Sequence, residues 1–243
     1  MPIVPVAEHR KRSRGPAIWL AGDPEDLKVW MPRGAYGIVT NTVVLNDMVK
    51  KYGQVIEVTK RYLDITDKQV VIEIDGHSTQ ELLDVGEVFT KMSDRIILKI
   101  PATEYALDAF ACLKKDGVET FCTTVFTLPQ AMAVAQAGVT HVLPFCEPYR
   151  DVGGDATKLV RECRDMFDRW GDPPYITAAL VRSVPTAYEA IRDGADGIIV
   201  FWPVFRDMMK NHLTDEWNKT FLNNWVEMHQ AGKLEGLPVR LGH

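Results

Sequence analysis

The chain has 243 residues, of which 46% are hydrophobic and 25% charged, and its formal net charge is −5. This composition is typical of a globular protein, excludes extensive disorder, and gives no general attraction to nucleic acid or to an anionic membrane. No segment approaches the roughly eighteen apolar residues of a membrane span, and the charged N-terminus lacks the apolar stretch of a signal peptide, so we expect a soluble, cytoplasmic protein.

The first predicted feature along the chain is a solvated N-terminal arm, residues 1–15. It contains the one strongly basic run, HRKRSR at 9–14. Contact of this run with nucleic acid or lipid is the alternative interpretation. Within residues 17–202 there is no linker rich in Pro, Gly or Ser, and we therefore expect one domain, residues 16–243.

Short apolar runs alternate with longer amphipathic segments from residue 17 to residue 202. Eight such runs are predicted as strands: 17–21, 36–40, 69–75, 95–100, 119–124, 141–145, 175–180 and 197–202. Gly117, Gly138 and Gly194 each stand where a helix would end before the next strand. Eight strands alternating with helices favour a (β/α)8 barrel, and an open doubly wound sheet is the alternative. No G-x-G-x-x-G motif follows the first strand.

The C-terminal segment, about 203–232, is predicted as a pair of helices belonging to the same domain. Trp217, Phe221, Trp225 and Met228 recur in it at helical spacing. The stripe could pack on the outside of the barrel, or it could cover a neighbouring subunit.

The sequence has no pattern typical of a metal or disulfide site. Its four cysteines include no C-x-x-C pair, so we expect reduced thiols and no structural zinc. His77 follows Glu73 and Asp75, but no H-x-H or H-E-x-x-H set accompanies it. We therefore expect neither a metal ion nor a cofactor.

Polar residues at the ends of the predicted strands are the candidates for chemistry, because catalytic groups in a parallel barrel project from the carboxyl ends of the strands. Each has a structural alternative: Asp23 before Pro24 could be a helix N-cap, Asn41 could stabilise a turn, Thr123 could be an ordinary strand residue, and Arg182 could be a solvated charge. The full set is Asp23, Thr40, Asn41, Glu73, Lys99, Thr123 and Arg182.

Lys99 and Glu73 are the hardest of these to explain structurally. Lys99 lies inside RIILKIPAT and Glu73 inside VVIEID, two runs made for burial. The structural alternative is a buried ion pair between neighbouring strands. The chemical interpretation is that burial lowers the lysine pKa and leaves free amine that can form a Schiff base with a carbonyl. We prefer the chemical interpretation.

These motifs, in this order and spacing, resemble the transaldolase and fructose-6-phosphate aldolase family of class I aldolases, including its short transaldolase subfamily. The similar segments are YGIVTNTVVL, VIEID, LKIPAT, FCTTVFTLPQAMAVAQAGVTHVLPF and NHLTDEWNKTFLNNW, from about Trp19 to Trp225. The resemblance implies that Lys99 is the Schiff-base nucleophile and that Asp23 removes the C4 hydroxyl proton. It implies further that Glu73 and Thr123 hold a water that shuttles protons, that Asn41 binds the dihydroxyacetone part, and that no metal is needed. Thr40, next to Asn41, is a further candidate for substrate binding.

Two positions bear on the type of reaction. In this resemblance the aldolase branch has glutamine on the third strand and tyrosine on the sixth, whereas the transferase branch has glutamate and phenylalanine. Here the residues are Glu73 and Phe145. The resemblance therefore favours a transferase that moves a dihydroxyacetone unit from a ketose, usually phosphorylated, to an aldose. A fructose-6-phosphate-aldolase-like lyase and a non-catalytic sugar-binding barrel are the alternatives.

The sequence departs from the family where the phosphate would bind. Pro148 stands at the position of an arginine, Leu180 at that of a serine, and Phe121 at that of an asparagine. Arg182 matches the family's second anion-binding arginine, and Arg150 could supply a displaced one. A sulfonated ketose or an unusual long-chain sugar would suit such a site. The resemblance also implies a homo-oligomer, a pentamer or a decamer, whose partners are sugars or sugar phosphates and not nucleic acid or membrane.

Overall fold

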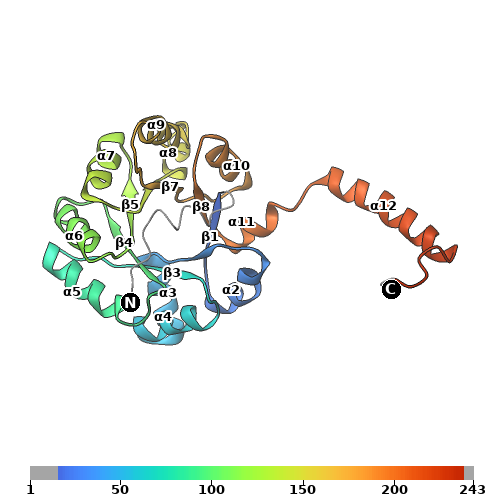
Figure 1. Cartoon of the computed structure of the whole chain (residues 1–243), viewed down its shortest axis with the longest axis horizontal. Coiled ribbons are helices and arrows are strands. Elements are labelled where there is room, and N and C mark those ends of the chain that lie inside the picture. The colour runs from blue at the N-terminus through green and yellow to red at the C-terminus, as the bar shows by residue number, and fades with distance from the viewer. Residues whose placement is uncertain (1–15, 238–243) are drawn as a thin grey trace. The chain divides into compact units, whose positions relative to one another are not determined.

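The computed structural model describes residues 16–237, and its larger part is a closed barrel of eight parallel strands (Figure 1). The strands follow one another around the barrel in chain order, and β1 pairs with β8 through Ala17 and Gly197. This closure confirms the barrel and excludes the open sheet. The strands are β1 (Ala17–Ala21), β2 (Gly37–Val39), β3 (Gln69–Glu73), β4 (Ile96–Pro101), β5 (Thr120–Val125), β6 (His141–Pro144), β7 (Tyr175–Ala178) and β8 (Gly197–Phe201).

Helices form the ring outside the strands (Figure 1). Several begin at a side chain that accepts a backbone N–H of the first turn: Asp23, Asn41, Ser78, Thr127 and Ser183. The helices of this part are α2 (Pro24–Trp30), the 3-10 turn η1 (Met31–Arg33), α3 (Thr42–Tyr52), α4 (Val55–Asp64), α5 (Thr79–Thr90), α6 (Glu104–Lys115), α7 (Leu128–Ala137), α8 (Glu147–Asp151), α9 (Lys158–Phe167), α10 (Val184–Arg192) and α11 (Trp202–Asp207).

The helix ends predicted from glycine are confirmed. Gly117, Gly138 and Gly194 all have positive φ angles. Gly138 ends α7 with φ 98°, and its N–H donates to the carbonyls of Val134 and Ala135. A left-handed C-terminal residue of this kind favours glycine and returns the chain to the next strand.

A layer of inward-facing side chains fills the middle of the barrel. It consists of Trp19, Val39, Val71, Ile97, Phe121, Leu143 and Ala179. Successive side chains of a strand point to opposite faces, so the residues two positions further along most of these strands also point inward, one layer closer to the carboxyl ends. Glu73, Lys99 and Thr123 stand at such positions. The barrel geometry therefore gathers the polar strand residues at one mouth.

The chain divides into two compact units, one ending at Phe205 and the other beginning at Arg206. The second unit contains α12 (His212–Gln230), whose N-cap is Asn211, and none of the residues of α12 is buried. The two predicted C-terminal helices correspond to α11 and α12. That this segment belongs to the barrel domain stays a prediction, and the predicted arm at 1–15 lies outside the described residues. Among the described helices none has the length and apolar character needed to cross a membrane.

A first prediction concerns the close approach of Gly37 to the core. A Cβ at this position would lie 2.4 Å from the ring of Trp19 and 2.8 Å from the carbonyl oxygen of Gln69. Gly37→Ala should therefore lower the free energy of unfolding by about 1–3 kcal/mol, because neither the buried indole nor the backbone can move aside. Urea denaturation followed by circular dichroism measures the change.

Gly171→Ala is the matched control, because nothing lies within 4 Å of a Cβ there. It should change stability by less than about 0.5 kcal/mol. Equal effects of the two substitutions would contradict the packing described for Gly37.

Candidate active site

The centre of the candidate site is the ammonium group of Lys99, near the carboxyl end of β4. Lys99 is 5% exposed. Its Nζ donates to Oε2 of Glu73 at 2.5 Å and to the backbone carbonyl of Thr40 at 3.0 Å. Glu73 and Lys99 are register partners on adjacent strands, which explains why their side chains meet. The structure therefore contains the buried ion pair of the structural interpretation, and the amine of this pair also faces a pocket, as the chemical interpretation requires.

The electrostatics of this pair are dominated by burial. Loss of hydration lowers the pKa of Lys99 below its ordinary value of 10.5, while the charge of Glu73 and its hydrogen bond act in the opposite direction. Because burial prevails, a larger fraction of Lys99 is free amine at neutral pH than of an exposed lysine. Only the free amine has the lone pair needed to attack a carbonyl carbon.

Thr40 and Asn41 lie beside the pair, after β2. The Thr40 hydroxyl donates to the Val71 carbonyl at 3.0 Å and accepts the Glu73 N–H at 3.0 Å, so it fixes β3 next to β2. The Asn41 side-chain oxygen accepts the Val44 N–H at 2.7 Å and caps α3. The amide nitrogen of Asn41 has no hydrogen-bond partner in the described part of the chain. Asn41 is therefore the N-cap of α3, where the structural alternative held a turn, and its amide can also donate into the pocket.

Thr123 supplies an unsatisfied polar atom at the same place. It is 1% exposed, and its hydroxyl has no hydrogen-bond partner among the described residues. A buried hydroxyl usually has a partner, and an orphaned one next to a cavity indicates a bound water or ligand. Glu73, Lys99 and Thr123 line the same cavity. This arrangement is suited to a water that carries protons.

The cavity opens at the carboxyl ends of the strands and has a volume of about 290 Å³, near the lower end of the range for small-molecule sites. Two residues that line it, Thr124 and Leu180, have φ angles of 57° and 51°. They are the only non-glycine residues of 16–237 with positive φ, and such strain is concentrated at functional sites. The lining consists of Ala21, Val39, Thr40, Asn41, Thr42, Val43, Glu73, Lys99, Thr123, Thr124, Phe145, Ala179, Leu180, Val181, Arg182, Ile199 and Phe201.

The structure does not bring Asp23 to this cavity. Its carboxylate caps α2 through the Glu25 N–H at 2.9 Å and accepts hydrogen bonds from Lys51 Nζ and the Tyr52 hydroxyl, both at 2.6 Å. Although burial raises the pKa of Asp23, these hydrogen bonds hold it below its ordinary value. The lining residue from β1 is instead Ala21, the inward-facing residue at the end of the strand. The N-cap interpretation of Asp23 is confirmed, and the geometry does not support its role as a base.

The two arginines considered for anion binding also differ in whether they reach the cavity. Arg182 is exposed and lines the rim of the cavity. Arg150 does not line it, because its guanidinium pairs with the carboxylates of Glu147 and Glu189. Phe145 lines the cavity and packs edge-on against Phe126, with ring centroids 5.1 Å apart. Only Arg182 is therefore available for an anionic substrate group.

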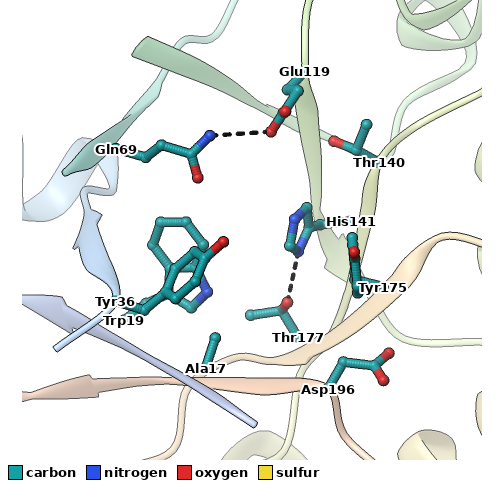
Figure 2. Close-up of a pocket in the computed structure, with 10 residues that line it drawn as sticks. All are labelled: Ala17, Trp19, Tyr36, Gln69, Glu119, Thr140, His141, Tyr175, Thr177 and Asp196. Carbon is teal, nitrogen blue, oxygen red and sulfur yellow. Dashed lines mark hydrogen bonds between the residues drawn. The ribbon is translucent and has the colours of Figure 1, made fainter. Parts of the chain in front are cut away.

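A second pocket lies at the amino ends of the strands (Figure 2). His141 bonds to Thr177 there at 2.9 Å, and Gln69 donates to Glu119 at 3.4 Å. The cavity volume is about 30 Å³, room for one or two waters. It contains no lysine and no cysteine, and it is too small for a sugar.

Within residues 16–237 no three or more His, Cys, Asp or Glu side chains come together in a way that could hold a metal ion. The predictions that the reaction needs neither a metal nor a cofactor stay predictions.

A buried lysine at the carboxyl mouth of a parallel barrel is an arrangement suited to barrel enzymes that form a Schiff base. Residues 42–230 match the family model described as Transaldolase/Fructose-6-phosphate aldolase. The chain belongs to this family.

Relatives of similar length agree with this assignment. A protein of Listeria monocytogenes serotype 4b (strain F2365) named "Probable transaldolase 1" is 33% identical over 189 residues, which cover 78% of this chain and 87% of the relative. A "Probable transaldolase" of Coprothermobacter proteolyticus is 31% identical over 194 residues, covering 79% and 89%. Another of Caulobacter vibrioides is 29% identical over 210 residues, covering 86% and 97%.

The barrel also resembles a solved structure of a more distant protein. The crystal structure of "a putative phosphonomutase from Burkholderia cenocepacia J2315" superimposes with a TM-score of 0.57 and covers 84% of this chain and 95% of its own. The sequence identity is 18%, so this likeness confirms the fold alone.

The placement of the carboxylates predicts different effects for two matched substitutions. Glu73→Gln should lower kcat/KM by about 100-fold or more, because it removes the carboxylate hydrogen-bonded to the amine. Asp23→Asn should change kcat/KM by less than about threefold, because the amide still caps α2 and the group does not reach the cavity. Steady-state kinetics on both variants measures the effects.

Circular dichroism of the two proteins provides the control for folding. A large loss of activity in a folded Asp23→Asn variant would restore Asp23 as the base implied by the family resemblance.

Proposed function

We propose that the protein is a transaldolase-type transferase that moves a dihydroxyacetone unit from a ketose, usually phosphorylated, to an aldose acceptor. The observation that carries the proposal is the buried amine of Lys99, hydrogen-bonded to Glu73 and facing a cavity with an unsatisfied hydroxyl. Membership of the transaldolase family supports a class I aldolase mechanism. The exact donor and acceptor go beyond what this membership states.

The first step is attack of the neutral Lys99 amine on the ketone carbon of the donor, which forms a carbinolamine. The carbinolamine hydroxyl then leaves as water after it receives a proton, and an iminium ion remains. Glu73 is in hydrogen-bond contact with Nζ and can move this proton, directly or through a water held by the Thr123 hydroxyl.

The second step breaks the bond between C3 and C4 of the donor. A base takes the proton of the C4 hydroxyl, an aldehyde leaves, and the electron pair of the broken bond moves into the iminium to give an enamine. Glu73 is the single carboxylate that lines the cavity within the described residues. We assign this second proton transfer to Glu73 as well, with a water as carrier, in place of Asp23.

The enamine then attacks the carbonyl carbon of the acceptor, and water hydrolyses the resulting iminium to release the new ketose and Lys99. Phe145 supports transfer over release of free dihydroxyacetone, because its side chain has no hydroxyl that could protonate the enamine carbon. Asn41 can donate its amide to hydroxyls of the bound unit, next to Thr40, and Arg182 can pair with an anionic end group at the rim.

The alternatives considered from the sequence remain distinguishable by assay. A fructose-6-phosphate-aldolase-like lyase would release free dihydroxyacetone without an acceptor, whereas the transferase requires one. If the enzyme is specialised for a sulfonated or long-chain sugar, that sugar will act as donor and a sugar phosphate will not. A non-catalytic sugar-binding barrel would turn over neither. A cytoplasmic location and a pentameric or decameric assembly stay proposals that rest on the family resemblance.

Reductive trapping tests the nucleophile. Borohydride added with fructose 6-phosphate should attach the dihydroxyacetone unit to one lysine, and mass spectrometry of peptides should place it at Lys99. Lys99→Met should give no adduct. The matched control is Lys91→Met, since Lys91 is exposed and pairs with Glu87 on the outer surface of α5. An adduct on another lysine, or none with any ketose, would contradict the proposed mechanism.

The pH dependence of trapping follows from burial of the amine. Since the pKa of Lys99 lies below the ordinary 10.5, the fraction of free amine rises and levels off at lower pH than for an exposed lysine. The single-turnover rate of trapping by cyanoborohydride should therefore reach half of its maximum below pH 10.5. Reductive methylation of exposed lysines in the same protein is the reference. A midpoint at or above that reference would show that Glu73 stabilises the ammonium more than burial destabilises it.

A further inference from the structure

The wall of the active-site cavity has two chemically different halves. Inward-facing residues at the carboxyl ends of β2 to β5 are polar: Asn41, Glu73, Lys99 and Thr123. The corresponding residues around β6, β7, β8 and β1 are apolar: Phe145, Ala179, Leu180, Val181, Phe201 and Ala21. The division runs through the middle of the barrel mouth, because the strands follow one another in chain order.

Apart from Arg182 at the rim, the side chains that line the apolar half include no hydrogen-bond donor or acceptor. Ala21, Ala179 and Val181 are 1–4% exposed, and Phe201 is 41% exposed at the outer edge. Leu180 adds a hydrocarbon side chain at a position whose φ of 51° leucine rarely adopts. A leucine in such a strained conformation indicates that the surrounding structure holds the backbone here in the conformation that shapes the cavity.

Charge near this half is confined to its rim. Arg182 is exposed, and Arg150 is held by Glu147 and Glu189 outside the cavity. A polyhydroxylated chain lying against the apolar half would lose hydrogen bonds to water and find no side-chain partners there. A hydrocarbon group loses nothing by the same move and gains from leaving water.

We propose, on the basis of the Schiff-base transfer proposed above but with another aldehyde in place of the aldose, that the preferred acceptor is an aldehyde with an apolar alkyl or aryl substituent. The polar half holds the three-carbon unit bound to Lys99, and the apolar half holds the substituent. The enamine carbon forms a bond to the aldehyde carbon, whose carbonyl electron pair moves to oxygen and takes a proton. Water then adds to the iminium, the amine leaves, and no electrons are gained or lost overall.

The test compares two acceptors with the full-chain enzyme and one donor, fructose 6-phosphate. The apolar probe is 3-phenylpropanal, and the hydroxylated probe is erythrose 4-phosphate, which differs from the aldehyde that the donor itself releases. The wild-type kcat/KM should be higher for 3-phenylpropanal, by about tenfold. Preference for erythrose 4-phosphate in a protein whose Lys99 is trapped by the donor would overturn this inference and leave the proposed function intact.

The two aldehydes differ in intrinsic reactivity. This difference cancels when the ratio of their kcat/KM values in a variant is compared with the same ratio in the wild type. Val181→Thr keeps the shape and adds a hydroxyl to the apolar half, so the ratio of kcat/KM values should move toward erythrose 4-phosphate by at least about fivefold. Ala21→Ser is a second variant for the case that Val181→Thr does not fold. Val88→Thr, at an exposed position of α5, should leave the ratio unchanged. An unchanged ratio in both cavity variants would overturn the inference.

A binding measurement separates failure of the inference from failure of the proposed function. Alcohols cannot form a Schiff base, so calorimetric titration with 3-phenylpropan-1-ol and with glycerol 3-phosphate reports on the cavity alone. Tighter binding of 3-phenylpropan-1-ol supports the apolar half even if no ketose is trapped at Lys99. Tighter binding of glycerol 3-phosphate overturns the inference whatever the trapping experiment gives.

Discussion

The chemistry proposed for this protein depends on one pair of groups, the Lys99 amine and the Glu73 carboxylate, held together in the interior of the barrel mouth. Their side chains are 6% and 9% exposed, so both have lost most of their hydration. Burial lowers the pKa of Lys99, and the nearby negative charge opposes that effect. The pairing thus places an amine whose pKa is lowered by burial within hydrogen-bond distance of a carboxylate.

The pair exists because strand alternation and register act together. Glu73 and Lys99 are register partners on β3 and β4, and Pro101 pairs with Thr123 on β5. Inward-facing positions repeat every second residue, so the apolar layer around Trp19 and Phe121 lies below them and seals the cavity from the opposite mouth. The same alternation carries the apolar side chains of β6, β8 and β1 to the other half of the cavity. The alternation of side chains along the strands thereby produces both the polar and the apolar half of the cavity wall.

The assignments that changed are those that depend on side-chain direction. Asp23 follows β1 closely enough in the sequence to reach the mouth, but it is the N-cap of α2 and is bonded to Lys51 and Tyr52. Arg150 lies near the sixth strand in the sequence, yet two carboxylates hold it outside the cavity. A difference of two residues at the end of a strand, or one nearby ion pair, decides whether a side chain lines the cavity or has a structural role. Family resemblance transfers a role to a position and cannot transfer the local geometry.

The sequence by itself determined the eight strands of this protein and the residue that we propose as its nucleophile. Apolar runs and returns at Gly117, Gly138 and Gly194 predicted eight strands, and a lysine within RIILKIPAT had to be paired or reactive, because burial of an ammonium is costly. Only the tertiary structure decided that Ala21 rather than Asp23 faces the cavity, that Arg182 alone of the two arginines reaches it, and that its wall is polar on one side and apolar on the other. These facts depend on which residues become neighbours when β1 pairs with β8 and the barrel closes, and neither periodicity nor composition contains that information.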